Sequence, residues 1–331
     1  MHETELRNLE NEITREREAT GMFFAEIQKV IVGQQYLLER IFLGLLANGH
    51  ILIEGLPGLA KTLAVQTFAK VVRLKFSRVQ FTPDMLPADL TGAPVYDQRT
   101  GTFIVKRGPI FANVVLADEI NRAPAKVQSA LLEAMQERQV TIGEDSFGLE
   151  HPFLVLATQN SIEQDGTYPL PESQLDRFML KVRVAYPTRS EEELILQRMA
   201  FTDMNIEVEE VYDPAHILHL RSLVDRIYID AKIGHYILDI VSASREPHQF
   251  NMPELTDLIQ YGVSPRAGLH LSLAAKAFAF IQGRSYVRPD DIKSVGRDVL
   301  CHRLIESYQA RAQNITAEDI VNKILDRLEA P

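Results

Sequence analysis

The sequence predicts an α/β protein built on a parallel sheet, followed by a smaller all-helical domain. Continuous apolar runs at 51–53, 114–117 and 153–157 fit strands that are buried on both faces of a parallel sheet. Beyond Pro187 the strand patterns stop, and helical periodicity fills most of the remaining chain. A chain of 331 residues is long enough for two such domains.

The composition is that of an ordinary globular chain, with 46% hydrophobic and 24% charged residues. The net charge of −10 argues against a surface that coats nucleic acid. A single cysteine, Cys301, excludes an internal disulfide and fits a reducing compartment, so we expect a cytoplasmic protein. No apolar run reaches the 18 or so residues of a membrane span.

We expect three regions along the chain: a helical N-terminal arm over 1–20, an α/β domain over 21–186 and an all-helical domain over 187–331. The arm is heavily charged, with apolar residues such as Leu9 and Ile13 at helical spacing, and we interpret it as a solvated helix. Helical patterns in the last domain cover 190–201, 214–228, 231–245, 265–283, 289–304 and 316–329.

A glycine-rich stretch follows the first apolar run and leads into a helical pattern that begins near Leu63. The stretch reads Gly55-Leu56-Pro57-Gly58-Leu59-Ala60-Lys61-Thr62. A strand, such a turn and Lys-Thr at a helix start form a phosphate-binding loop, where backbone N–H groups and the helix dipole hold the anion. Lys61 can reach the outer phosphates, and Thr62 can offer its hydroxyl to Mg²⁺.

Ala60 occupies the position where the general pattern of this loop has its second glycine. We expect this residue to have the negative φ of a residue entering a helix, where alanine is as suitable as glycine.

Two carboxylates end the second apolar run, at the edge where ligands bind in parallel α/β sheets. Asp118 is expected to hold Mg²⁺, and Glu119 to act as the general base for an attacking water. Asn160 follows the third run, where its amide could orient that water or contact a phosphate. It could equally be a turn former after a strand.

Three further features bear on the site. Val32 and Gly33 form a flexible apolar turn that could cover an adenine ring. Residues 82–111 are rich in Pro and Gly and read as a long loop with a hairpin near 95–105, and a second hairpin is expected near 140–149. Arg266 follows Ser264 and Pro265 at a helix start, where a cation opposes the helix dipole. A phosphate ligand or a nearby acid would explain it.

Taken in order, these motifs resemble the AAA+ ATPases over about residues 22–304, and more closely the MoxR family. The matching stretches are 54–62, 82–92, 108–111, 117–124, 157–160, 175–178 and 262–267. The resemblance implies ATP and Mg²⁺ as cofactors and a P-loop parallel sheet with helices on both faces, followed by an all-helical lid. It also implies ring oligomers, with hexamers expected.

The same resemblance assigns roles to residues outside the phosphate loop. It makes Asn160 the first sensor, Arg177 an arginine finger supplied to a neighbouring subunit, and Arg266 the second sensor. Val32 and Gly33 would line the adenine pocket. The two hairpins would be the inserts that distinguish this part of the AAA+ class.

The leading prediction is an ATPase that assembles or activates partner proteins, which by resemblance include von Willebrand factor A domain or metal-cofactor proteins. One alternative is the ATPase subunit of a metal chelatase. A DNA-remodelling motor is less favoured, because the second hairpin is acidic, with Glu144 and Asp145 at its turn. A nucleotide-dependent scaffold without hydrolysis is disfavoured by Glu119.

Overall fold

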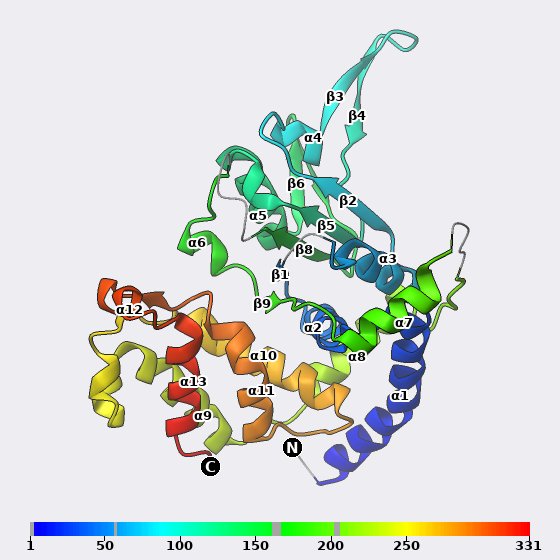
Figure 1. Ribbon diagram of the computed structural model, residues 1–331. Helices are drawn as coiled ribbons and strands as arrows, with labels where there is room; N and C mark the ends of the chain where they lie inside the picture. The colour runs from blue at the N-terminus through cyan, green and yellow to red at the C-terminus, as the bar shows by residue number, and fades with distance from the viewer. Residues whose placement is uncertain (1–2, 56–57, 161–166, 202–205) are drawn as a thin grey trace. The chain divides into compact units, whose positions relative to one another are not determined.

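A computed structural model describes residues 3–55, 58–160, 167–201 and 206–331 (Figure 1). The chain divides into two compact units. The sheet unit contains residues 19–170 and 182–219, and the helical unit contains residues 1–18, 171–181 and 220–331. The domain limits expected at residues 20 and 186 stay predictions.

The sheet unit is built on five parallel strands in the order β2-β5-β8-β1-β9, with helices on both faces. The strands are β1 (Ile51–Glu54), β2 (Phe76–Gln80), β5 (Val114–Asp118), β8 (Leu154–Gln159) and β9 (Leu180–Arg183). The side chains of β5 are buried from Val114 to Ala117, as the continuous apolar run predicts. The α/β fold with a parallel sheet is confirmed.

The helices of the sheet unit are α2 (Gln35–Leu46), α3 (Lys61–Val71), α4 (Pro87–Thr91), α5 (Ala125–Glu137) and α7 (Arg189–Met199), with a 3-10 turn at Ile120–Arg122. An aromatic cluster supports α2 and α3, since Phe23 lies 4.6 Å from Phe42 and 5.4 Å from Phe68 between ring centroids. The helix α4 was not expected within 82–111. Pro87 is tolerated there because it occupies the first turn.

Two antiparallel hairpins extend the sheet unit. One consists of β3 (Gly92–Asp97) and β4 (Thr102–Arg107), and the other of β6 (Gln139–Ile142) and β7 (Asp145–Gly148). Both were expected from the sequence. The β3–β4 hairpin projects away from the parallel sheet (Figure 1).

The helical unit packs α9 (Ala231–Arg245), α10 (Pro265–Ile281), α11 (Pro289–Leu300) and α13 (Ala317–Arg327) against one another (Figure 1). Smaller elements complete it: α6 (Glu172–Leu175), α12 (Tyr308–Ala312), two 3-10 turns at Pro247–Phe250 and Pro253–Leu255, and a two-stranded sheet of β10 (Ile259–Tyr261) and β11 (Ile305–Glu306). Two helices run from one unit into the other, α1 (Glu3–Val30) and α8 (Pro214–Arg226).

The N-terminal arm differs from its prediction as a solvated helix. It is the first part of one long helix, α1, and Leu9 and Ile13 are buried in the helical unit, 0% and 1% exposed. Arg226 donates a hydrogen bond to Glu12 at 2.9 Å, which ties the arm to α8. The helical spacing of Leu9 and Ile13 therefore indicated the face of α1 that is buried in the helical unit. Within the described ranges, none of the helices is long and apolar enough to cross a membrane.

Candidate functional site

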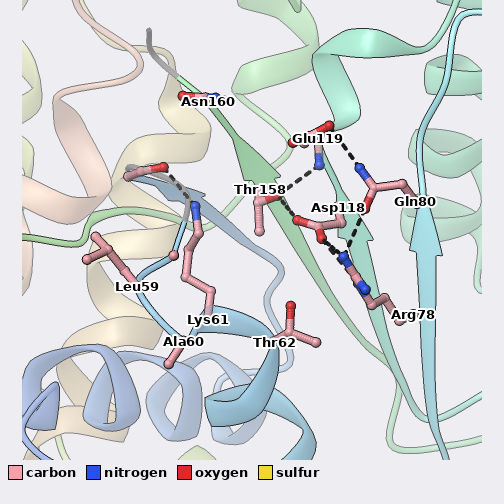
Figure 2. Close-up of a pocket in the computed structure, with 12 residues that line it drawn as sticks. Leu59, Ala60, Lys61, Thr62, Arg78, Gln80, Asp118, Glu119, Thr158 and Asn160 are labelled. Atoms are coloured by element: carbon pink, nitrogen blue, oxygen red, sulfur yellow. Dashed lines mark hydrogen bonds and ion pairs between the residues drawn. The ribbon is translucent and has the colours of Figure 1, made fainter. Parts of the chain in front are cut away.

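The glycine-rich loop connects β1 to α3, and α3 begins at Lys61. The Nζ of Lys61 donates to the carbonyl oxygen of Gly55 at 2.7 Å, so the side chain folds back over the loop (Figure 2). Burial lowers the pKa of Lys61, and the carboxylates of Asp118 and Glu119 oppose that shift. Leu56 and Pro57, predicted to contact the nucleotide, lie outside the described residues.

The expectation for Ala60 is wrong. Its φ is 53° and its ψ is 23°, which places it in the left-handed region directly before α3. The chain still has to turn at this residue to enter the helix, and glycine adopts such a conformation more readily than alanine. Ala60 therefore carries backbone strain of about 1 to 2 kcal/mol.

The carboxylates of Asp118 and Glu119 stand at the carboxyl end of β5, and Thr158 of β8 joins them. The Oγ1 of Thr158 donates to Asp118 at 2.6 Å and accepts from the backbone N–H of Glu119 at 2.8 Å (Figure 2). Glu119 is itself left-handed, with a φ of 58°. Thr158 therefore fixes the backbone of one acid and the side chain of the other.

Strand β2 supplies two more partners to the acid pair. The Nη2 of Arg78 donates to Asp118 at 2.6 Å, and the Nε2 of Gln80 donates to Glu119 at 2.8 Å (Figure 2). Arg122 donates to the same carboxylate of Glu119 at 3.0 Å. Gln80 and Arg122 both donate to the same oxygen of this carboxylate, Oε2.

A cavity of about 420 Å³ opens between the loop and the acid pair. Its lining includes most of the predicted phosphate and metal residues together with the new partners: Gly55, Gly58, Leu59, Ala60, Lys61, Thr62, Arg78, Gln80, Asp118, Glu119, Thr158 and Asn160. The structure thus brings the loop, the two acids and Asn160 to one place.

A second and more apolar pocket, of about 520 Å³, shares the far side of the loop. Val32 and Leu63 line it, as do Tyr186 and several side chains of α7. Gly33, with a φ of 68°, lies beside Val32, and a Cβ at this glycine would collide with the carboxylate of Glu191. Gln34 donates to the carbonyl oxygen of Leu59 at 2.5 Å and joins this turn to the phosphate loop.

The two remaining predicted arginines, Arg177 and Arg266, belong to the helical unit. Arg266 donates to Asp176 at 3.0 Å, so a nearby acid does accompany this cation. Ser264 stands at the N-cap of α10 as expected, but its hydroxyl donates to Asp176 at 3.2 Å and makes no capping hydrogen bond.

Thr158, Arg78 and Gln80 were not predicted from the sequence. Residues 78 and 80 are two apart on a strand, so they share one face of β2, and Gln80 is in register with Asp118. Polar residues at such spacing, on a strand predicted beside the acid-bearing strand, were a signal that could have identified them.

Known proteins resemble this chain in sequence and in fold. Residues 50–180 match the model of the "ATPase family associated with various cellular activities (AAA)", and residues 256–324 match an AAA lid domain. The chain is 46% identical over 306 residues to Chaperone MoxR1 of Mycobacterium tuberculosis, covering 92% of this chain and 81% of that protein. It is 30% identical to Protein MoxR of Methylorubrum extorquens, covering 96% and 97% of the two chains.

A solved structure is also similar along its whole length. It is a putative ATPase from Cytophaga hutchinsonii, with a TM-score of 0.93, 45% identity and 99% of each chain covered. These matches in sequence and fold include both the sheet unit and the helical unit. The chain therefore belongs to the MoxR family and is an AAA ATPase.

Proposed function

We propose that this ATPase binds ATP with Mg²⁺ in the cavity at the carboxyl edge of the sheet and uses hydrolysis to assemble or activate partner proteins. One observation carries the catalytic part of the proposal. Lys61, Thr62, Asp118, Glu119 and Asn160 line a single cavity at the start of α3.

The loop residues divide the binding of the nucleotide between them. Backbone N–H groups from Gly58 to Thr62 and the positive end of α3 bind the phosphates, and Lys61 adds a cation. The apolar pocket beside Val32, Gly33 and Leu63 takes the adenine ring.

Two side chains fit Mg²⁺, because they present oxygen atoms to the same cavity, namely Thr62 and Asp118. The ion would neutralise charge that builds up on the transferring phosphoryl group. Glu119 then serves as base, and Asn160 orients the water or the outermost phosphate.

Exchange of Glu119 for Gln tests this assignment. The amide keeps the size of the side chain but accepts no proton, so turnover should fall about 10²- to 10⁴-fold while ATP stays bound. A fluorescent ATP analogue measures binding, and phosphate release measures turnover. Glu133→Gln, an exposed position on α5, is the matched control. Turnover close to that of the control would remove Glu119 from the role of base.

We further propose that the chain works as a ring, with hexamers expected, in which Arg177 completes the site of the next subunit. Mixing two inactive variants tests this arrangement. A Lys61→Ala subunit has a defective loop but an intact Arg177, and an Arg177→Ala subunit has the reverse. In an equal random mixture about a quarter of the head-to-tail interfaces combine an intact loop with an intact arginine. Recovery of activity on mixing is expected, and none would mean that Arg177 acts within its own subunit or not at all.

The β3–β4 hairpin supports the partner part of the proposal. Phe103 is 72% exposed and Tyr96 is 54% exposed, and their rings lie 5.4 Å apart across the two strands. Val95 and Ile104, on the other face of this two-stranded hairpin, are also exposed. Apolar residues exposed on both faces are typical of a surface that contacts another protein.

We propose von Willebrand factor A domain or metal-cofactor proteins as the partners, acting in the cytoplasm, which the single Cys301 suits. The test measures ATPase stimulation by a purified von Willebrand factor A domain and by the same domain without its metal-binding acids. Stimulation by the intact domain alone is expected. Chelatase subunits form a second arm, and stimulation by them alone would favour the chelatase alternative.

Duplex DNA forms the third arm of the same experiment. The β3–β4 hairpin carries Arg99, Lys106 and Arg107, whereas the β6–β7 hairpin carries Glu144 and Asp145 at its turn. The acidic hairpin disfavours phosphate contact. Stimulation by DNA at moderate salt would overturn the partner-protein proposal in favour of a nucleic-acid motor.

A further inference from the structure

A cluster of charged side chains around Asp176 lies within the helical unit and has no role in the function described so far. Asp176 directly follows α6 and precedes Arg177. Its carboxylate accepts hydrogen bonds from Arg266 Nη1 at 3.0 Å and from Arg303 Nε at 2.8 Å. The hydroxyl of Ser264 donates to both carboxylate oxygens at 3.2 Å. One acid therefore connects the segment of Arg177 with the first turn of α10.

The Arg303 guanidinium is the fixed part of this cluster. Its side chain is 1% exposed. Besides the carboxylate of Asp176, it donates to the backbone carbonyl oxygens of Asp176 at 3.1 Å, Phe178 at 2.5 Å and Met179 at 3.2 Å. These bonds bracket Arg177 on both sides. Arg303, just after α11, thus fastens the backbone that carries the predicted arginine finger to the helical unit.

Arg266 is the arginine of this cluster that can exchange Asp176 for another anion. Its side chain is 40% exposed, and its ion pair is with a carboxylate that Arg303 already neutralises. His270 adds no charge at neutral pH, because burial and the adjacent Arg303 lower its pKa to about 3. Asp176, Arg303 and Arg266 together therefore leave one positive charge in excess, at the positive end of α10. Arg266 can therefore leave for an anion while Arg303 still neutralises the carboxylate of Asp176.

We propose that Asp176 is a positioning residue that holds Arg266 until ATP arrives and couples that arginine to Arg177. The inference rests on the proposed binding of ATP and on the role of second sensor, a contact with phosphate, that the family resemblance implies for Arg266. When Arg266 leaves Asp176 and binds the nucleotide, Asp176 loses one of its two arginine partners. Asp176 directly precedes Arg177 in the chain, so this change occurs next to the predicted arginine finger. The positions of Arg266 and Arg177 then both depend on the carboxylate of Asp176. Binding of ATP in one subunit would therefore change the position of the Arg177 that this subunit supplies to its neighbour.

Asp176 and ATP compete for Arg266 in this scheme, so Asp176 should lower the affinity of the protein for ATP. Asp176→Asn removes the competitor, so the variant should bind a fluorescent ATP analogue about threefold to fivefold more tightly than the wild type. Its kcat should fall at least about tenfold, because the segment of Arg177 loses one anchor. Tighter binding with slower turnover distinguishes positioning from a structural role, which would not tighten binding.

A double-mutant cycle with Arg266→Ala isolates the competition. Adding Asp176→Asn to Arg266→Ala should leave the affinity for the ATP analogue unchanged, because no arginine remains to be released. Equal tightening with and without Arg266 would show a general charge effect and overturn the inference, as would the absence of any tightening in Asp176→Asn. A wild-type protein that does not bind the analogue would instead contradict the proposed function.

Asp176→Asn leaves Arg303 buried without its counter-charge and could unfold the helical unit. The double variant Asp176→Asn with Arg303→Gln removes both charges and keeps polar groups in the cluster. It should show the same tightening that depends on Arg266, and thermal unfolding verifies that it is folded. If this folded variant binds ATP as the wild type does, the inference fails.

Discussion

The acid pair of the sheet unit and the Asp176 cluster of the helical unit both hold carboxylates against arginines, but the arginines differ in exposure. Arg78 and Arg122, the partners of Asp118 and Glu119, are 48% and 45% exposed. Arg303 is 1% exposed. An exposed ion pair contributes about 0 to 1 kcal/mol, whereas loss of one partner from a buried pair costs about 3 to 5 kcal/mol. We therefore expect Arg78 and Arg122, like the 40% exposed Arg266, to exchange their carboxylates for a ligand, whereas Arg303 holds a backbone segment in place.

The backbone differs between the two regions in the same sense. Ala60 and Glu119, on either side of the nucleotide cavity, both have positive φ. Asp176 has ordinary helical angles, with a φ of −60°. Two residues that line the cavity therefore carry backbone strain, whereas the central residue of the Asp176 cluster does not.

The largest expected effect separates the two kinds of arginine directly. Arg303→Met should lower the free energy of unfolding by about 3 to 5 kcal/mol, because Asp176 and several carbonyl oxygens lose their buried donor. Arg78→Met should change it by no more than about 1 kcal/mol, since Arg78 is itself half exposed and Asp118 keeps its hydrogen bond from Thr158. Urea unfolding measures both. Equal losses of unfolding free energy in the two variants would mean that Arg303 and Arg78 do not differ in their contribution to stability.

The acid dependence of stability gives the next effect. Burial lowers the pKa of His270 from 6.5 to about 3, so the unfolded chain binds a proton in that window and the folded chain does not. Stability should therefore fall as the pH falls from 6.5 toward 3, by up to about 1.4 kcal/mol per pH unit. At a pH above 6.5 the effect is absent.

His270→Gln should flatten this dependence, and His235→Gln, at an exposed position on α9, is the control. Urea midpoints between pH 4 and pH 7 measure both variants. His302 stays in each protein, and burial also lowers its pKa well below 6.5, so part of the slope remains. Identical slopes for the two variants would contradict a neutral His270.

The sequence was sufficient for the parts of the site that are contiguous in the chain. The phosphate loop, Asp118 and Glu119 each follow an apolar strand pattern, and the parallel sheet brings such strand ends together. Arg78 and Gln80 depend on the register of β2 against β5, which the pattern of one strand does not contain. Asp176 and Arg303 are 127 positions apart, so their pairing comes only from the packed fold.

Removal of Arg78 from Asp118 should change the Mg²⁺ requirement, and this effect is expected to be smaller than the effects on stability described above. In the proposed metal site, Arg78 would compete with Mg²⁺ for Asp118, so Arg78→Met should lower the Mg²⁺ concentration for half-saturation about threefold to fivefold. Binding of a fluorescent ATP analogue at increasing Mg²⁺ measures the change. Arg73→Met, which removes another exposed and ion-paired arginine, is the control. A requirement as high as that of the control would mean that Arg78 does not compete with the metal.

Ala60→Gly is expected to have the smallest effect, and it tests the backbone strain at the end of the phosphate loop. Glycine relieves a left-handed conformation that costs alanine about 1 to 2 kcal/mol. Its greater freedom in the unfolded chain offsets roughly 0.5 to 1 kcal/mol of that gain. The free energy of unfolding should therefore stay the same or rise slightly. Ala64→Gly, within the same helix α3, has no strain to relieve and should lose about 1 kcal/mol or more. Urea unfolding compares the two, and equal losses would show that Ala60 enters α3 with the ordinary helical φ that the sequence had suggested.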